Sequence, residues 1–226
     1  MIRLYHVSKY YKTEQGKKYI LNDVTMTIPS GVNIGILGRN GAGKSTLLRM
    51  LGGIDFPNEG VITSEQSFSW PMGLGGGFQG SMTGRQNIKF VCRIYGKSEA
   101  QIKQIMEEVA AFSELGDYFD MPIKTYSSGM KSRLSFGLSL AFDFDYLIID
   151  ETLSVGDKNF QAKSKAALRA KIENCHILLV SHAMPTLREL CDVGIVVDNG
   201  TIRYFDKIDD AINLYESLNL VESHHD

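Results

Sequence analysis

The sequence predicts an α/β fold with a mostly parallel sheet and a helical insert. Apolar runs at 32–37, 146–149 and 177–180 lack polar alternation, as buried parallel strands do. Residues 2–6 and 20–28 instead alternate apolar and polar side chains in the manner of strands. Between the first and second apolar runs the spacing becomes helical, which indicates a helical insert in an α/β chain.

The elements follow in order along the chain. Strands are expected at 2–6 and 20–28, on either side of a polar turn at 13–18. The apolar run at 32–37, a Gly-rich turn and helical spacing over 45–51 then form a strand–loop–helix unit. Further helices are expected at 87–95, 99–115, 128–142 and 206–218. The last helix is amphipathic, with one face formed by Ile208, Ala211, Ile212, Tyr215 and Leu218.

Composition limits the possible classes of protein. The 226 residues, 43% hydrophobic and 22% charged, are typical of a globular chain, and we expect one domain over 1–226. A net charge of −2 gives no reason to expect nucleic acid as a partner. The three cysteines form neither a disulfide pattern nor a zinc pattern. The sequence shows no charged-then-apolar leader at Met1 and no apolar run as long as the ~18 residues needed to span a bilayer. A membrane role is therefore expected to come through a partner.

The strongest local signal is Gly38-Arg-Asn-Gly-Ala-Gly-Lys-Ser45, which fits the P-loop pattern between a strand and a helix. Its glycines let backbone N–H groups turn toward phosphate oxygens. Lys44 is expected to reach the β- and γ-phosphates, and the Ser45 hydroxyl to ligate Mg²⁺. A chance Gly-rich turn is the alternative, which the strand–helix context disfavours. The expected nucleotide-binding residues here are Gly38, Arg39, Asn40, Gly41, Ala42, Gly43, Lys44, Ser45 and Thr46.

Two neighbouring carboxylates, Asp150 and Glu151, end the apolar segment Leu147-Ile-Ile-Asp-Glu151. Open α/β sheets bind ligands at the carboxyl ends of their strands. We therefore expect Asp150 to hold Mg²⁺ through water and Glu151 to polarise the attacking water. Taken alone, an Asp-Glu pair after apolar residues is often a solvated strand end; the P-loop favours the functional interpretation.

The segment Tyr126-Ser-Ser-Gly-Met130 resembles the signature motif of ABC ATPases, usually Leu-Ser-Gly-Gly-Gln. By chemistry alone a Ser-Ser-Gly run before a helix is an N-cap, and a helix N-terminus is also an anion site. The resemblance implies that Ser127 and Gly129 touch the γ-phosphate bound by the opposite subunit. Met130 departs from the usual Gln.

Three further positions match the ABC ATPase family. Asp157, in Ser154-Val-Gly-Asp157, matches the acidic residue of the D-loop, and His182, in Val180-Ser-His182, matches the switch histidine that contacts the γ-phosphate. A histidine after a strand is more often structural, but the order of the motifs favours the catalytic role. Tyr11 resembles the aromatic residue that stacks on adenine.

The resemblance covers nearly the whole chain and implies an architecture and cofactors. The expected fold is that of the P-loop ABC ATPases: a mostly parallel core sheet, an N-terminal antiparallel β subdomain, a helical subdomain at about 84–142 and a C-terminal helix. It implies ATP and Mg²⁺ bound in a head-to-tail homodimer.

Gln79 matches the family less cleanly. The Q-loop of the family carries a glutamine that senses Mg²⁺ and faces the membrane subunit, and Gln79 lies closer to Asn87 than is usual. Two interpretations stay open: Gln79 is the Q-loop glutamine of a shortened loop, or it has another role, such as contacting the permease.

A narrower resemblance is to the ATP-binding subunits that export bacterial surface polysaccharides, above all capsular polysaccharide. It is carried by residues 78–88, 126–134, 141–145 and 150–157. It implies two permease subunits, periplasmic or outer-membrane export components, a polysaccharide cargo and a place on the cytoplasmic face of the inner membrane. Open alternatives are an O-antigen or teichoic-acid-type exporter, an importer, a soluble ABC ATPase and a module that never turns over.

Overall fold

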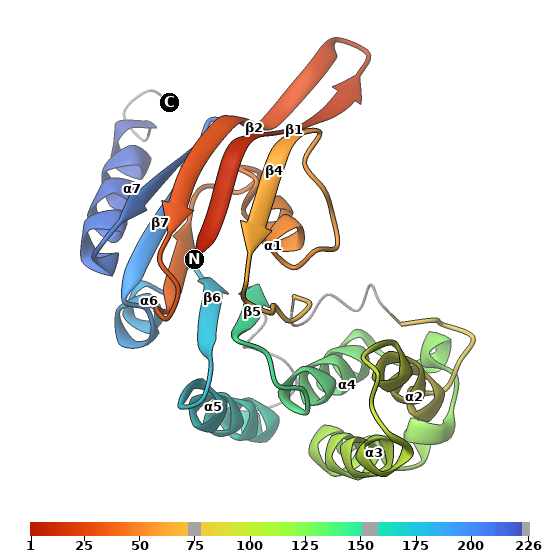
Figure 1. Cartoon of the computed structure of the whole chain (residues 1–226). Helices are drawn as coiled ribbons and strands as arrows, with labels where there is room; N and C mark the ends of the chain where they lie inside the picture. The colour runs from red at the N-terminus through yellow and green to blue at the C-terminus, as the bar shows by residue number, and fades with distance from the viewer. Residues whose placement is uncertain (72–77, 151–157, 223–226) are drawn as a thin grey trace. The chain divides into compact units, whose positions relative to one another are not determined.

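The computed structural model describes residues 1–71, 78–150 and 158–222. The chain divides into two compact units (Figure 1). The first consists of Met1–Pro71, Phe144–Glu151 and Cys175–Asp226, and the second of Met72–Asp143 and Thr152–Asn174. Among the described residues, no helix combines the length and the apolar character needed to cross a bilayer.

An antiparallel sheet opens the first unit. Its strands, in the order β2-β1-β4, are β1 (Ile2–Thr13), β2 (Gly16–Ile28) and β4 (Glu59–Ser64). β1 and β2 continue through most of the polar segment expected to be a turn. Cross-strand contacts support this extension: the rings of Tyr10 and Tyr19 lie 5.2 Å apart, and the Lys17 ammonium lies 4.0 Å from the Tyr10 ring centroid.

The second sheet of this unit has the order β5-β6-β3-β7-β8. Its strands are β3 (Ile34–Leu37), β5 (Tyr146–Asp150), β6 (His176–Val180), β7 (Val193–Asp198) and β8 (Thr201–Phe205). All pairs are parallel except β7 with β8. β3 is buried throughout, which confirms that the apolar runs are core strands. The Asn199–Gly200 turn, with φ of 46° and 78°, joins β7 to β8, neither of which was expected.

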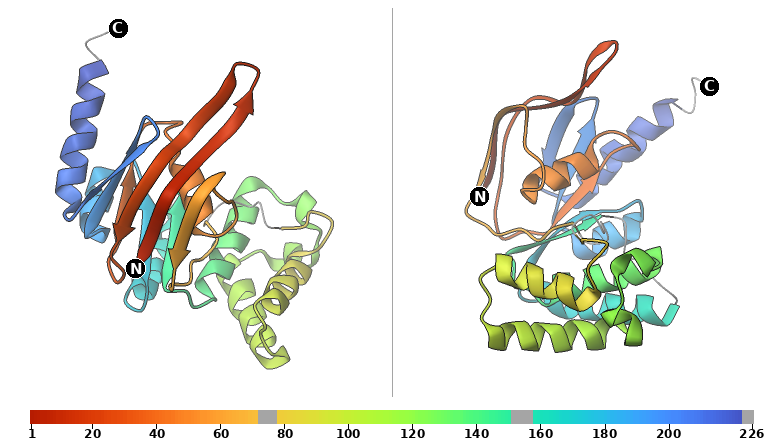
Figure 2. Two further views of the ribbon diagram at one scale, coloured as in Figure 1. Left: turned by 45° about the horizontal axis from the view of Figure 1, so that its top comes forward. Right: turned by 90° about the vertical axis from the view of Figure 1, so that its right-hand side faces the viewer.

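Three helices accompany these sheets: α1 (Lys44–Leu51), α6 (Met184–Leu190) and α7 (Ile208–Glu222). The C-terminal helix was expected at 206–218. Figures 1 and 2 show α7 running alongside β7 and β8, and its residues Ala211 and Ile212 are fully buried.

The second unit is helical; three of its helices lie in the insert expected at about 84–142, and a fourth lies beyond it in the sequence. It contains α2 (Gly84–Ile94), α3 (Glu99–Ser113), α4 (Ser128–Leu140) and α5 (Lys158–Ile172), with two 3-10 turns at Gly116–Asp120 and Ile123–Thr125. α2 begins three residues before position 87 because Thr83 and Gln86 form a capping box. α5 contributes Phe160, whose ring lies 5.5 Å from that of Phe112.

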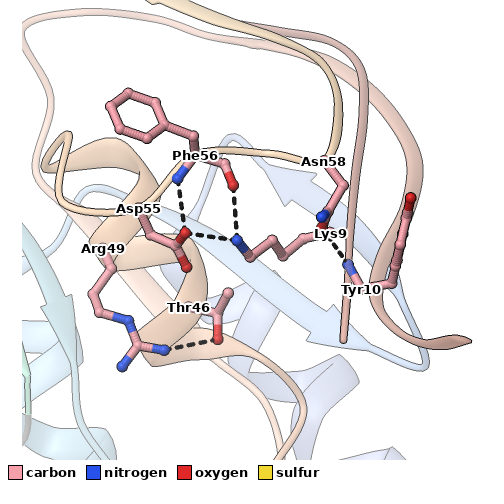
Figure 3. A network of polar contacts seen from close by, with 7 residues as sticks. All are labelled: Lys9, Tyr10, Thr46, Arg49, Asp55, Phe56 and Asn58. Carbon is pink, nitrogen blue, oxygen red and sulfur yellow. Dashed lines mark hydrogen bonds and ion pairs between the residues drawn. The ribbon is translucent and has the colours of Figure 1, made fainter. Parts of the chain in front are cut away.

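A polar network fixes the loop that follows α1 to strand β1 (Figure 3). The Lys9 ammonium donates to the Asp55 carboxylate at 2.6 Å and to the Phe56 carbonyl at 2.8 Å, and the Lys9 side chain is 9% exposed. Burial raises the pKa of Asp55, but the bonds from Lys9 and the Phe56 N–H outweigh it, so the pKa lies below its ordinary value. The Asp55 N–H in turn donates to the Arg49 carbonyl at 3.2 Å, which links this loop to the last turn of the helix that begins at Lys44.

We expect Lys9→Met to lower the free energy of unfolding by about 1–3 kcal/mol, because the Asp55 carboxylate loses its charged partner. A depressed folded-state pKa stabilises the fold above the unfolded pKa and loses that stabilisation as the pH falls through the folded value. The difference between wild type and variant should therefore shrink in acid. Urea unfolding at neutral and acidic pH measures both effects. Lys12→Met, at an exposed position of the same strand, is the control; an equal loss there would contradict the assignment.

Candidate active site

Three strands of the second sheet end at the same edge and carry the expected catalytic segments. The register aligns Ile36 of β3 and Asp150 of β5 with Val180 of β6. The P-loop starts directly after β3, Asp150 ends β5, and His182 follows β6 by two residues. Parallel pairing therefore brings to one edge three segments that are far apart in the sequence.

The loop from Gly38 to Gly43 needs glycine for steric reasons. Gly38, Gly41 and Gly43 have φ of 153°, 80° and 107°, which L residues with a side chain rarely adopt. A Cβ on Gly38 would lie 2.4 Å from the Val197 carbonyl oxygen, and one on Gly43 would lie 2.5 Å from Cγ2 of Ile20. Gly43 is also the N-cap of α1, so the loop ends at a helix N-terminus, where backbone N–H groups favour an anion.

Lys44 is buried at the start of α1, with 8% of its surface exposed. Its ammonium donates to the carbonyls of Gly38 and Arg39, at 2.6 and 2.9 Å. The side chain thus folds back across the loop, and its positive charge lies beside the turned backbone. A charged ammonium beside this loop can donate short, strong hydrogen bonds to phosphate oxygens.

A cavity of about 220 Å³ opens over the loop. It is lined by Ile20, Asn40, Gly41, Gly43, Lys44, Ser45, Thr46 and Asp150. The Ser45 hydroxyl and the Asp150 carboxylate supply oxygen ligands, which Mg²⁺ prefers while it keeps several waters. The donors and the cavity therefore fit a nucleotide phosphate chain with Mg²⁺. Ile20, whose side chain closes one wall, is a residue that sequence reasoning missed.

A second cavity of about 390 Å³ shares Ile20, Asn40 and Gly41 with the first. Its other lining residues are Lys18, Tyr19, Arg39, Ala42, Asp198, Asn199 and Gly200. Tyr11 lies on β1 opposite Lys18, with 44% of its surface exposed, and neither cavity includes it among the described lining residues. Its stacking on adenine stays a prediction.

The remaining residues of the P-loop segment have structural partners. Thr46 is buried and its hydroxyl accepts a bond of 3.3 Å from Arg49. The guanidinium of Arg39 donates to the Leu218 carbonyl of α7.

His182 is exposed, and its Nδ1 lies 3.4 Å from the Tyr215 hydroxyl, also on α7. Glu151 and Asp157 lie outside the described residues, so their expected roles stay predictions.

The signature segment belongs to the second unit. Ser127 is the N-cap of α4, and its hydroxyl accepts the Met130 N–H at 3.2 Å. A Cβ on Gly129 would meet only the Ser127 Oγ, at 3.9 Å. Packing within the described residues therefore gives no reason for glycine at 129.

Gln79 also belongs to the second unit, where a buried asparagine holds its backbone. Asn87, 1% exposed, accepts the Gln79 N–H at 2.7 Å and donates to the carbonyls of Gln79 and Thr83, at 3.1 and 2.9 Å. The Gln79 residue itself is exposed. Both interpretations of Gln79 stay open, and the anchoring role of Asn87 is a feature that spacing alone did not reveal.

Comparisons with known proteins agree with this geometry. The sequence model of a family described as ABC transporter matches residues 21–154. The chain is 51% identical to the polysialic acid transport ATP-binding protein KpsT of Escherichia coli, over 96% of each chain. It is 46% identical to the capsule polysaccharide export ATP-binding protein CtrD of Neisseria meningitidis serogroup B, over 96% of this chain and 100% of that one. Among solved structures, the ATP-binding cassette MJ0796 shares the fold, with a TM-score of 0.75 at 20% identity over 92% of this chain and 99% of that one.

Gly41→Ala should weaken ATP binding about tenfold or more, because Gly41 lines the cavity and an added methyl group would take space from the phosphates. The left-handed conformation should also cost about 1–2 kcal/mol of stability. Gly53→Ala is the matched control: Gly53 has a φ of 69° and, like Gly41, open space around its Cβ, but it lines neither of these cavities. Calorimetric titration with ATP and urea unfolding measure the two effects. Equal affinities in the two variants would contradict the assignment of the loop.

Proposed function

The chain belongs to the ABC transporter family, and from this premise we propose that it is the ATP-hydrolysing subunit that powers export of a capsular polysaccharide. The observation that carries the cargo assignment is similarity over nearly the full length to proteins named for polysialic acid and capsule export. The phosphate cavity over the P-loop supports the ATPase assignment.

ATP is held at the P-loop in this proposal. The backbone N–H groups of residues 38–45 surround the phosphates, and Lys44 exchanges its carbonyl partners for β- and γ-phosphate oxygens. Mg²⁺, when bound, neutralises charge on those oxygens; Ser45 and Asp150 would hold it, the latter through water, and Gln79 is a further candidate. Tyr11 stacks on the adenine ring.

Glu151, which follows β5, and His182, which follows β6, act in hydrolysis. Glu151 orients the attacking water and accepts its proton. His182 donates to the γ-phosphate as negative charge shifts there in the transition state. Both residues follow strands that are paired in register, since Asp150 lies opposite Val180.

A second copy of the chain completes each site. Ser127 and Gly129 at the start of α4 close over the γ-phosphate held by the opposite P-loop, and Asp157 contributes to the same interface. The absence of a side chain at Gly129, which internal packing of the described residues does not require, supports an approach from outside. Closure and reopening of this dimer is a two-state switch biased by the γ-phosphate.

The dimer in turn works on membrane partners. We propose two permease subunits, with the ATPase on the cytoplasmic face of the inner membrane, and further periplasmic or outer-membrane export components. O-antigen or teichoic-acid-type export is the alternative cargo assignment, and a soluble ABC ATPase the alternative class. A failure of the chain to co-purify with membranes would favour the soluble class.

Changing Glu151 to Gln in the native host tests the assignment. The variant should bind ATP and dimerise but hydrolyse ATP at least about 100-fold more slowly, because the water loses its general base. Capsular polysaccharide should then disappear from the surface and accumulate inside the cell. Surface glycan staining, cell fractionation and phosphate release from the assembled complex measure these effects.

Glu173→Gln is the matched control, since it makes the same chemical change at an exposed position outside the site; it should export normally. An unchanged capsule in the Glu151→Gln strain would refute the cargo assignment while leaving the ATPase intact. Rapid ATP hydrolysis by Glu151→Gln would show that Glu151 is not the general base.

A further inference from the structure

The C-terminal helix α7 packs unusually close to the five-stranded sheet. A Cβ on Gly194 of β7 would lie 2.2 Å from Cβ of Ala211, and one on Gly35 of β3 would lie 2.6 Å from Cδ1 of Ile208. The two glycines therefore let the helix approach the strands more closely than side chains there would allow. Figures 1 and 2 show the helix along this side of the first unit.

The N-terminal end of α7 is also tied to the segment that follows His182. The Ile208 N–H donates to the Asp192 carbonyl at 3.1 Å. Arg188 of α6 donates to the Asp209 carboxylate at 2.8 Å. Helix α6 starts at Met184, directly after the loop that carries His182. Helix α7 is therefore connected both to the sheet and to the helix that follows this loop.

From this base α7 reaches two loops at the phosphate edge. Three residues apart on the helix, the Tyr215 hydroxyl lies 3.4 Å from Nδ1 of His182 and the Leu218 carbonyl accepts the guanidinium of Arg39. A distance of 3.4 Å is long for this bond, as hydrogen bonds of catalytic groups often are before a ligand binds. One helix thus contacts the loop after β3 and the loop after β6.

We propose that Tyr215 is a positioning residue that acts through His182 by fixing its tautomer. The Tyr215 hydroxyl donates to Nδ1, which places the proton of the neutral ring on Nε2. An Nε2–H group is a donor that a phosphate oxygen can accept. The proposal rests on the proposed function only in the role that it gives to His182.

The chemistry of the imidazole ring explains why the tautomer matters. A neutral histidine carries one N–H, and the bond made by one ring nitrogen decides which nitrogen has the proton. With the proton on Nδ1, the lone pair of Nε2 would repel a phosphate oxygen. A tyrosine hydroxyl can donate or accept, but a phenol O–H is a stronger donor than a neutral imidazole N–H, and an imidazole nitrogen is a stronger acceptor than a phenol oxygen. Tyr215, held by a helix that packs on the sheet, therefore favours the tautomer with its proton on Nε2 before the nucleotide arrives.

The test is Tyr215→Phe in the full-length protein, with nitrogen NMR of isotopically labelled histidine in the absence of nucleotide. Wild type should show His182 with its proton on Nε2 and Nδ1 as acceptor. The variant should show a mixture of tautomers. In the assembled transporter its kcat for ATP hydrolysis should fall roughly two- to tenfold with KM unchanged. Tyr204→Phe, which removes a hydroxyl from β8 of the same unit, should change neither measurement.

Unchanged His182 nitrogen signals in Tyr215→Phe would overturn the proposal, whatever the rate of hydrolysis. A changed tautomer with an unchanged kcat would also overturn it, provided that His182→Ala lowers hydrolysis. If His182→Ala hydrolyses ATP normally, the catalytic role of His182 in the proposed function fails, and the tautomer measurement still decides whether Tyr215 controls the ring. The two failures are therefore distinguishable.

Discussion

The parallel register of β3, β6 and β5 is the constraint on which the site depends. Ile36 and Asp150 both lie opposite Val180, so the segments after these strands leave the sheet at one edge. A shift of one residue in β5 would turn Asp150 away from the cavity, because successive side chains of a strand point to opposite faces. The mostly buried, apolar strands that set this register therefore position the proposed catalytic residues, although among the described residues only Asp150 of these strands lines the phosphate cavity.

Several contacts within the first unit fix the P-loop at this edge. Glycines at 38 and 43 fit closely against Val197 and Ile20, the Lys9–Asp55 pair fixes the loop beyond α1, and α7 contacts Arg39. These contacts hold the phosphate side in place. At the start of α4 the described packing leaves Gly129 without neighbours that exclude a side chain. In the proposed dimer, a P-loop that is fixed within the first unit of one chain meets the start of α4 of the second chain, where the described packing does not require glycine at 129.

Much of this was predictable from sequence, and the exceptions have physical causes. The core strands and the P-loop were found because uninterrupted apolar runs and glycine spacing are local signals. The hairpin of β7 and β8 was not predicted although Asn199-Gly200 is a strong turn signal. Helix α2 begins at Gly84, before the expected 87, because the capping box of Thr83 and Gln86 satisfies the N–H groups of an earlier first turn. The Tyr215–His182 contact is different in kind. The amphipathic pattern of the last helix placed Tyr215 on its apolar face, but its partner His182 lies 33 residues away in the sequence. The contact between them also depends on the close packing of α7 at Gly194.

The central claim is that the P-loop of one chain and the start of α4 of another form one site, and heterodimers of differently tagged chains test it most directly. In a Glu151→Gln background, one heterodimer carries Lys44→Ala and Gly129→Asp on the same chain, and the other carries them on different chains. An acid in the first turn favours a helix, so Gly129→Asp should leave α4 folded while repelling phosphate. The account predicts stable ATP binding only with the substitutions on different chains, since one complete shared site then survives. Binding only with both substitutions on the same chain would contradict the account, because it would show that each site is formed within a single chain.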